Sequence, residues 1–260
     1  MREALIVWGG WSGHEPEPCA RIVAGMLEEE GFRVHVDNTT RAFSSPGLAS
    51  MSLVVPIITM AKIEKNEVEN LTTAVRSGVG LAGFHGGMGD AFRDAVEYQF
   101  MCGGQWVAHP GNIIDYRVNI LRRDDRVMQG IEDFDYRSEQ YYMHVDPSNQ
   151  VLATTTFSGE HAGWIDGVVM PVVWKRRHGE GRVFYSSLGH VAAEFEVPQM
   201  RTILRTYRDI VQTELFPGRT LVPKTLIFAK DDSHAEDIVH LCREVFGKGN
   251  DFCKKITYQA

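Results

Sequence analysis

The stretch Leu81-Ala82-Gly83-Phe84-His85-Gly86-Gly87 decides the predicted fold of this 260-residue chain. Its apolar first half is typical of a buried strand, and the histidine followed by two glycines predicts a sharp turn into a helix. A nucleophile elbow uses this strand–turn–helix geometry to hold one side chain exposed at the carboxyl end of a sheet. We therefore predict that His85 projects into a functional site.

Strand-like and helix-like segments alternate around this stretch. The expected strands are residues 4–8, 32–36, 53–58 and 79–84, and the expected helices are residues 17–30, 64–76 and 88–101. More strands follow at 116–121, 151–156, 169–176 and 181–187. Alternation over short loops predicts an α/β fold with a doubly wound, mainly parallel sheet. Ligands bind such sheets at the carboxyl ends of the strands, which is where we expect the functional residues.

The composition excludes several classes of protein. Apolar residues make up 43% of the chain and charged residues 23%, which is ordinary for a globular protein. A net charge of −7 argues against a general nucleic-acid or anionic-membrane binder. No apolar run approaches the ~20 residues that span a bilayer, and the first residues are typical of a strand rather than a signal peptide. We expect a cytoplasmic protein, whose four scattered cysteines form no disulfide framework.

Two histidines are the candidate acids and bases. His85 follows one predicted strand and His190 follows another, so the topology brings both to one edge of the sheet. Glu139 is the carboxylate that we expect to orient or protonate a histidine, with a solvated strand-end glutamate as the alternative. The predicted catalytic set is His85, His190 and Glu139.

Further residues in the loops are candidates for substrate binding. Trp11 can stack on a sugar face or on a planar ligand, or form a lid over the core. The other candidates are polar side chains at strand ends or in glycine-rich loops: His14, His109, Asn112 and His144. His85, His109, His144, His190 and Glu139 are also ligand types that zinc takes, although no HxxxH or HExxH spacing occurs. The sequence implies no firm cofactor and leaves a divalent metal such as zinc open.

Four segments carry a resemblance to a known family. Gly80–Gly87, Glu139–Tyr142, Pro171–Lys175 and Gly181–His190 resemble the trehalose-utilisation (ThuA-like) family over residues 1–205. This family is a branch of the class I glutamine amidotransferase-like fold, so the resemblance implies a flavodoxin-like sheet.

The resemblance also identifies a missing nucleophile. In the amidotransferase relatives a cysteine occupies the elbow, and the histidine after the last strand is its base. Here His85 replaces the cysteine and His190 matches the base, while Cys102 lies a helix beyond the elbow. We therefore expect no glutamine amidotransferase activity.

The resemblance implies disaccharide metabolism, with 3-keto-disaccharides as substrates and a sugar oxidoreductase as the partner that makes them. A 3-keto group acidifies the proton at C2, so a histidine base can start an elimination that expels the C1 substituent. A non-catalytic carbohydrate-binding or regulatory module is the alternative. The sequence leaves a homo-oligomer open.

Residues 206–260 form a different predicted unit. Glu214–Thr220 and Pro223–Ile238 resemble a fragment of a type I restriction enzyme helicase subunit. The pattern predicts a short βαβ-type appendage with a strand at 224–229, a helix at 234–246 and a strand start at 255–258. Acidic and basic residues balance in this segment, so the net charge belongs to residues 1–205. The segment lacks the nucleotide-binding half of a motor, so we expect no helicase activity.

Overall fold

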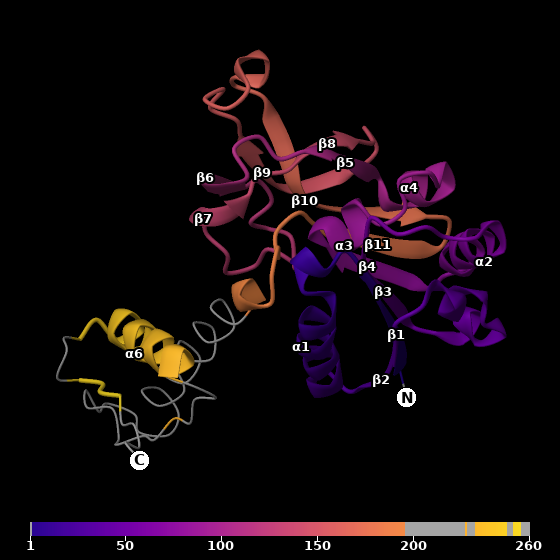
Figure 1. The fold of residues 1–260 in the computed structure, drawn as a ribbon, viewed down its shortest axis with the longest axis horizontal. Helices are drawn as coiled ribbons and strands as arrows, with labels where there is room; N and C mark the ends of the chain where they lie inside the picture. The colour runs from indigo at the N-terminus through magenta and orange to yellow at the C-terminus, as the bar shows by residue number, and fades with distance from the viewer. Residues whose placement is uncertain (1, 196–226, 228–231, 249–251, 256–260) are drawn as a thin grey trace. The chain divides into compact units, whose positions relative to one another are not determined.

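The computed structural model describes residues 2–195, 227, 232–248 and 252–255 (Figure 1). Contacts divide the chain into two compact units, Met1–Ala192 and Ala193–Ala260. The boundary that the sequence suggests, after residue 205, falls inside the second unit.

The first unit is built on a nine-stranded mixed sheet in the order β2-β1-β3-β4-β11-β10-β9-β6-β7. Its parallel half contains β1 (Arg2–Gly10), β2 (Phe32–Asp37), β3 (Leu53–Thr59), β4 (Gly80–Phe84) and β11 (Gly181–Ser186). The antiparallel half adds β10 (Val169–His178), β9 (Gln150–Thr156), β6 (Ile113–Ile120) and β7 (Phe134–Glu139). The predicted α/β class with a parallel core is confirmed.

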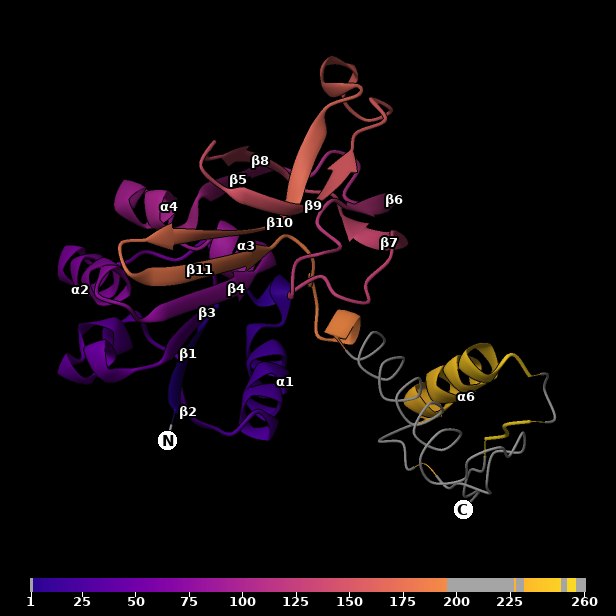
Figure 2. The ribbon, with the colours of Figure 1, turned by 180° about the vertical axis from the view of Figure 1, so that it is seen from behind.

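Helices cover the parallel half. In Figures 1 and 2, α1 (Pro16–Glu29) lies on one side of the sheet, and α2 (Lys65–Arg76) and α4 (Val96–Cys102) lie on the other. Alternate residues of β1 point to the same face of the sheet. Leu5 and Val7 join the large core cluster that also contains Leu71, so this face packs against α2.

The antiparallel half projects away from the helices, and β5 (Gly104–Ala108) and β8 (Tyr142–Val145) form a separate two-stranded sheet beside it (Figure 2). Short 3-10 turns complete the unit: Ser12–His14, Thr40–Ser44, Pro46–Ser50 and Gly163–Ile165. Where β4 ends, α3 (His85–Gly89) begins at once, as the elbow requires.

The predicted helix over 88–101 is wrong, because the structure breaks it into α3 and α4. After α3 the chain stays buried, and residues 90 and 91 bond to the loop after β3. The backbone N–H groups of Met60 and Ala61 donate to the carbonyl oxygens of Asp90 and Ala91. These tertiary bonds replace the helical ones, and Arg93 binds the Asp90 carboxylate at 2.7 Å.

The sequence pattern did not predict three of the strands: β5, β7 and β8. Pro56 lies inside β3, where its ring removes a backbone donor. It pairs with Val7 of β1 and lies beyond Leu53 and Val54, the two residues of β3 that pair with β4.

In the second unit, α6 (Asp232–Phe246) confirms the predicted helix. Ile238, Leu241, Cys242 and Val245 form its buried cluster. The strands predicted at 224–229 and 255–258 lie almost wholly outside the described residues. None of the helices in the described part of the chain combines the length and apolar character that a membrane span requires.

Candidate functional site

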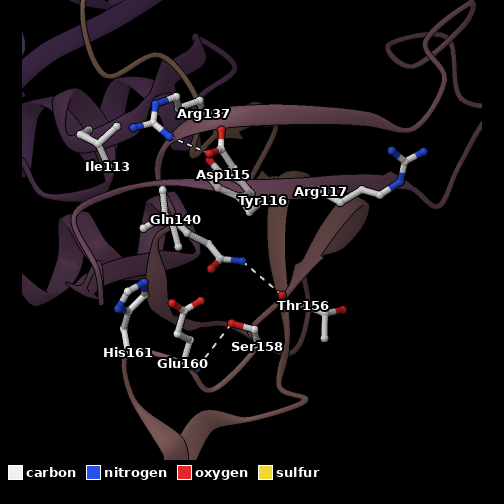
Figure 3. A pocket seen from close by; sticks show the side chains of 11 residues that line it. Ile113, Asp115, Tyr116, Arg117, Arg137, Gln140, Thr156, Ser158, Glu160 and His161 are labelled. Carbon is white, nitrogen blue, oxygen red and sulfur yellow. Dashed lines mark hydrogen bonds and ion pairs between the residues drawn. The ribbon is translucent and has the colours of Figure 1, made fainter.

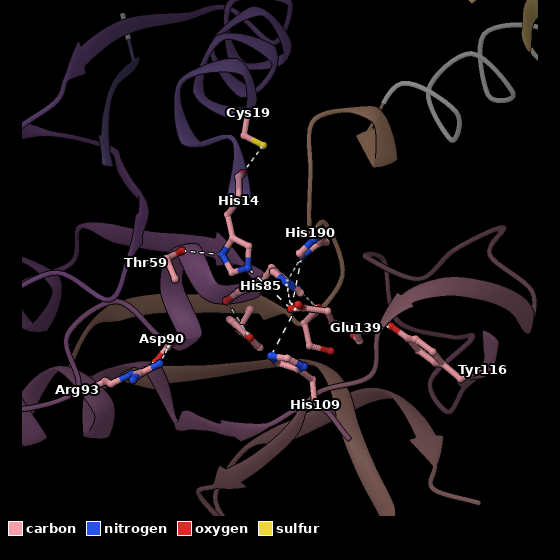
Figure 4. Close-up of polar contacts among 12 residues, drawn as sticks. His14, Cys19, Thr59, His85, Asp90, Arg93, His109, Tyr116, Glu139 and His190 are labelled. Carbon is pink, nitrogen blue, oxygen red and sulfur yellow. Dashed lines mark hydrogen bonds and ion pairs between the residues drawn. The ribbon is translucent and has the colours of Figure 1, made fainter. Parts of the chain in front are cut away.

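The carboxyl ends of the parallel strands converge on one group of polar side chains (Figure 4). His14 follows β1, Thr59 ends β3, His85 follows β4, and Ser187 and His190 follow β11. Adjacent parallel strands end at one edge of a sheet, so residues far apart in sequence meet here. The convergence predicted for His85 and His190 is present.

His85 occupies the elbow in a left-handed backbone conformation, with φ of 46°. Non-glycine residues adopt this conformation at a cost of order 1–3 kcal/mol, and it occurs often at functional sites. The hydroxyl of Tyr185 donates to the His85 carbonyl at 3.0 Å, and the imidazole stacks on Tyr141 with ring centroids 4.1 Å apart. The ring is 1% exposed. These contacts fix the ring and hold the strained backbone in place.

Glu139, the last residue of β7, lies at the centre of the histidines. Its Oε2 is 3.1 Å from His85 Nε2, 3.4 Å from His190 Nδ1 and 3.8 Å from His14 Nε2. Its other oxygen, Oε1, is 3.7 Å from His109 Nε2. We call His14, His85, Glu139 and His190 the histidine–glutamate cluster.

Burial and hydrogen bonding set the charges of this cluster. Burial alone would raise the pKa of the Glu139 carboxyl, but its hydrogen bonds with His14, His190 and His85 outweigh burial and hold that pKa far below its ordinary value. Burial lowers the pKa of His85, against the opposing hydrogen bond with Glu139. The cluster therefore holds a carboxylate, and burial favours the neutral form of His85.

His14 is fixed from two sides. Its Nδ1 lies 2.9 Å from the Thr59 hydroxyl oxygen, and the edge of Trp11 packs against its ring with centroids 4.7 Å apart. A Cβ on Gly86 would lie 2.5 Å from the His14 ring, so the glycine after the elbow residue makes room for this histidine. Trp11 itself is 45% exposed.

The other predicted binding residues are distributed differently. His109 follows β5 and borders the cluster, and its carbonyl accepts from the backbone N–H of Asn112. Asn112 is exposed in that turn, with φ of 57°. His144 lies on β8 with an exposed side chain, beside a separate hollow lined by Gln105 and Asp146. The structure thus brings His109 to the cluster and places His144 elsewhere.

Sequence reasoning missed two supporting residues, Thr59 and Tyr141. Thr59 is the terminal residue of an apolar parallel strand, where a single polar side chain is a usable signal. Tyr141 lies two residues after Glu139, and burial raises its pKa well above the ordinary value, so the phenol stays protonated beside the carboxylate. Together they position His14, His85 and Glu139.

The cluster has the composition of a metal site. Each of its four residues offers one ligand atom, and these atoms all lie within 4.8 Å of one another. Three imidazoles and a carboxylate are ligands that zinc takes.

A hollow of about 430 Å³ lies along β6 and β7 of the first unit (Figure 3). Its lining includes Arg117, Arg137, Gln140 and His161 and none of the cluster residues. We place the functional site at the cluster because the polar groups converge there.

Cys102 does not replace the missing nucleophile. It is buried at the end of α4, and burial raises the pKa of its thiol to about 12. A thiol held protonated in this way is a poor nucleophile.

Solved structures share this fold. A ThuA-like protein of Parabacteroides merdae is 18% identical with a TM-score of 0.61, over 73% of this chain and 80% of that one. A ThuA-like protein of Bacteroides uniformis is 17% identical with a TM-score of 0.61, over 75% and 84%. A cytoplasmic protein of Salmonella typhimurium is 11% identical with a TM-score of 0.51, over 71% and 86%.

Among curated proteins, none matches this chain. The family described as trehalose utilisation, ThuA, matches residues 3–206, which include the elbow and the whole histidine–glutamate cluster. On that match, the chain belongs to the ThuA trehalose-utilisation family.

Proposed function

We propose that this protein cleaves 3-keto-disaccharides by acid–base chemistry at the histidine–glutamate cluster. The observation that carries the proposal is the packing of three histidines around the carboxylate of Glu139 at the carboxyl ends of the parallel strands. The family supports a sugar-related ligand, and a sugar oxidoreductase is the partner that would supply the keto group.

Accessibility separates the roles of the histidines. His85 is buried, and its two ring nitrogens face Ser187 and Glu139, so it positions the carboxylate and cannot reach a sugar. The side chains of His190 and His109 are 15% and 28% exposed, on either side of Glu139. These two are the candidates for proton transfer with the substrate.

The proposed step balances as an elimination. One of the two histidines takes the proton from C2, next to the 3-keto carbon, and the C–H electrons form the enolate. The enolate then re-forms the ketone as a C1–C2 double bond appears and the C1–O bond breaks. The other histidine, protonated, gives its proton to the departing oxygen. General acid–base catalysis of this kind contributes about 10²–10⁴-fold to a rate.

The test is to incubate the purified full-length protein with 3-keto-trehalose and to identify the released sugars by mass spectrometry. We expect turnover in the wild-type protein. Removing a proton-transfer group in His190→Asn or His109→Asn should lower the rate by about 10²–10⁴-fold. His35→Asn is the matched control. His35 is exposed on β2, and its side chain faces Glu3 rather than the cluster.

Absence of turnover would contradict the enzyme. If 3-keto-trehalose nevertheless raises the melting temperature, and His190→Asn abolishes that shift, the protein is a carbohydrate-binding module of the same site. For either function we propose a cytoplasmic location.

A further inference from the structure

We propose that the histidine–glutamate cluster binds one divalent cation of the zinc type, with His14, His85, His190 and Glu139 as its four ligands. The geometry points to it. Bonds of about 2.1 Å to a tetrahedral zinc would place neighbouring ligand atoms about 3.4 Å apart. Here His85 Nε2 lies 3.2 Å from His190 Nδ1, Glu139 Oε2 lies 3.1–3.8 Å from the three imidazole nitrogens, and all four ligand atoms lie within 4.8 Å of one another.

The hydrogen bond on the far side of His85 indicates which way its lone pair faces. Nδ1 of His85 lies 2.8 Å from the carbonyl oxygen of Ser187. A carbonyl only accepts, so Nδ1 carries the proton, and the neutral ring turns the lone pair of Nε2 toward the cluster. That lone pair faces the Glu139 carboxylate oxygen at 3.1 Å. Two acceptors at this distance need a cation between them, either a metal ion or a second proton on the ring.

His14 also has an outer partner on its second ring nitrogen, in this case a hydroxyl, which can donate or accept. Its Nδ1 contacts the Thr59 hydroxyl, which leaves Nε2 directed toward Glu139 (Figure 4). Metal-binding histidines usually have an outer partner of this kind on the second ring nitrogen, because that bond fixes the tautomer and the ring orientation. Two of the three histidines therefore have the outer support of a metal ligand.

Burial makes the group a site rather than a chance surface gathering. The side chains of His14, His85, Glu139 and His190 are 10%, 1%, 9% and 15% exposed. Four separate parallel or edge strands deliver them, and their mutual positions are set by the sheet. Imidazole and carboxylate donors suit zinc, and the described part of the chain contains no second group of three such residues.

The cation site does not rest on the proposed sugar chemistry, but it limits which histidine can transfer the proton. A His190 whose Nδ1 binds a cation cannot transfer a proton from that atom, so His109 would take the C2 proton and then give it to the departing oxygen.

The experiment uses the full-length protein after removal of metal by a chelator and dialysis. Zinc is titrated by calorimetry, and bound zinc is counted by mass spectrometry after desalting. We expect one zinc per chain. Co²⁺ in place of zinc should give the visible absorption bands of a four- or five-coordinate site with nitrogen and oxygen ligands.

Two kinds of variant test the assignment. His14→Ala and Glu139→Gln each remove a ligand, and Thr59→Val removes only the outer partner of His14. We expect Thr59→Val to weaken zinc binding by about 10–100-fold, and each ligand variant to weaken it more. Thr59→Val keeps all four ligands and the buried volume, so it remains informative if a ligand variant does not fold. His35→Ala controls for surface binding.

The outcomes separate this inference from the proposed function. Failure of the stripped wild-type protein to take up one zinc would overturn the cation site and leave the acid–base proposal standing. Zinc uptake that His35→Ala weakens, or that Glu139→Gln and Thr59→Val leave unchanged, would also overturn it, because the ion would be bound elsewhere. Zinc binding that follows the cluster variants, without turnover of 3-keto-trehalose, would support the cation site and contradict the enzyme.

Discussion

A single glycine determines whether His14 can take part in the site. Gly86 follows the elbow residue, and a methyl group there would lie 2.5 Å from Cε1 and 2.7 Å from Nδ1 of the His14 ring. The ring cannot simply rotate away, because Thr59 holds Nδ1 and Trp11 packs against its face. The glycine therefore makes room for the histidine that follows β1, besides its place in the elbow turn.

We expect Gly86→Ala to move the His14 ring out of the cluster and to lower the free energy of unfolding by about 1–3 kcal/mol, the usual cost of overpacking a core. Urea unfolding measures the stability, and the imidazole resonances of His14 in two-dimensional NMR report its displacement. Gly25→Ala is the matched control, since a Cβ at this position of α1 meets nothing within 4 Å. It should raise stability by about 0.5–1 kcal/mol. An unchanged His14 spectrum in Gly86→Ala would contradict the steric argument.

At the residue scale, the sequence predicts the site better where a residue follows a recognisable strand. His85 and His190 each follow a predicted strand, so their meeting follows from the topology. Glu139 could be named as a candidate carboxylate, but its central position could not, because it comes from the far edge strand. His144 has the same chemistry as the other histidines, yet the alternation of β8 turns Met143 inward and His144 outward.

At the element scale, the local sequence pattern predicts a helix or strand correctly where the tertiary contacts favour the same structure. The parallel strands and α1 and α2 lie close to their predicted ranges because apolar period and burial coincide. The predicted helix over 88–101 is interrupted because residues 90 and 91 bond to the loop after β3, a contact that local propensity does not contain. The alternation Phe134-Asp135-Tyr136-Arg137 in β7 was a usable strand signal.

The last residue of β10 is a buried histidine, His178, whose charge the fold disfavours. Burial, and then the nearby cations of Arg76 and Arg176, lower the pKa of His178. Its Nε2 has no hydrogen-bond partner among the described residues. Because the folded chain resists protonating this ring, the unfolded chain binds the proton more readily as the pH falls below the ordinary histidine value.

His178 should therefore contribute to a loss of stability toward acid. We expect the free energy of unfolding to fall as the pH drops from about 7.5 to about 5.5, a window that spans the ordinary histidine pKa of about 6.5. His178→Gln removes this titration, so the free energy of unfolding of the variant should fall less steeply over the same range. Comparing chemical unfolding of the two proteins at each pH cancels the contributions of other groups. Identical slopes would show that His178 titrates alike in both states.

At the scale of the whole molecule, the family match and the site belong to the first part of the chain. The match ends at residue 206, and all nine strands of the main sheet and every cluster residue lie within Met1–Ala192. The second unit has a small apolar cluster of its own around α6. The net charge of −7 likewise belongs to the residues before 206.

Deleting residues 206–260 tests whether the second unit matters to the first. Because the main core and the histidine–glutamate cluster are complete without it, we expect the truncated protein to stay soluble and to melt in one cooperative transition. Its melting temperature should match the main transition of the full chain in calorimetry, and its zinc stoichiometry should be unchanged. Loss of the folded state on truncation, with circular dichroism as the readout, would show that the first unit needs the second for stability. The helicase-like resemblance would then describe a segment that has become part of this fold, rather than an independent appendage.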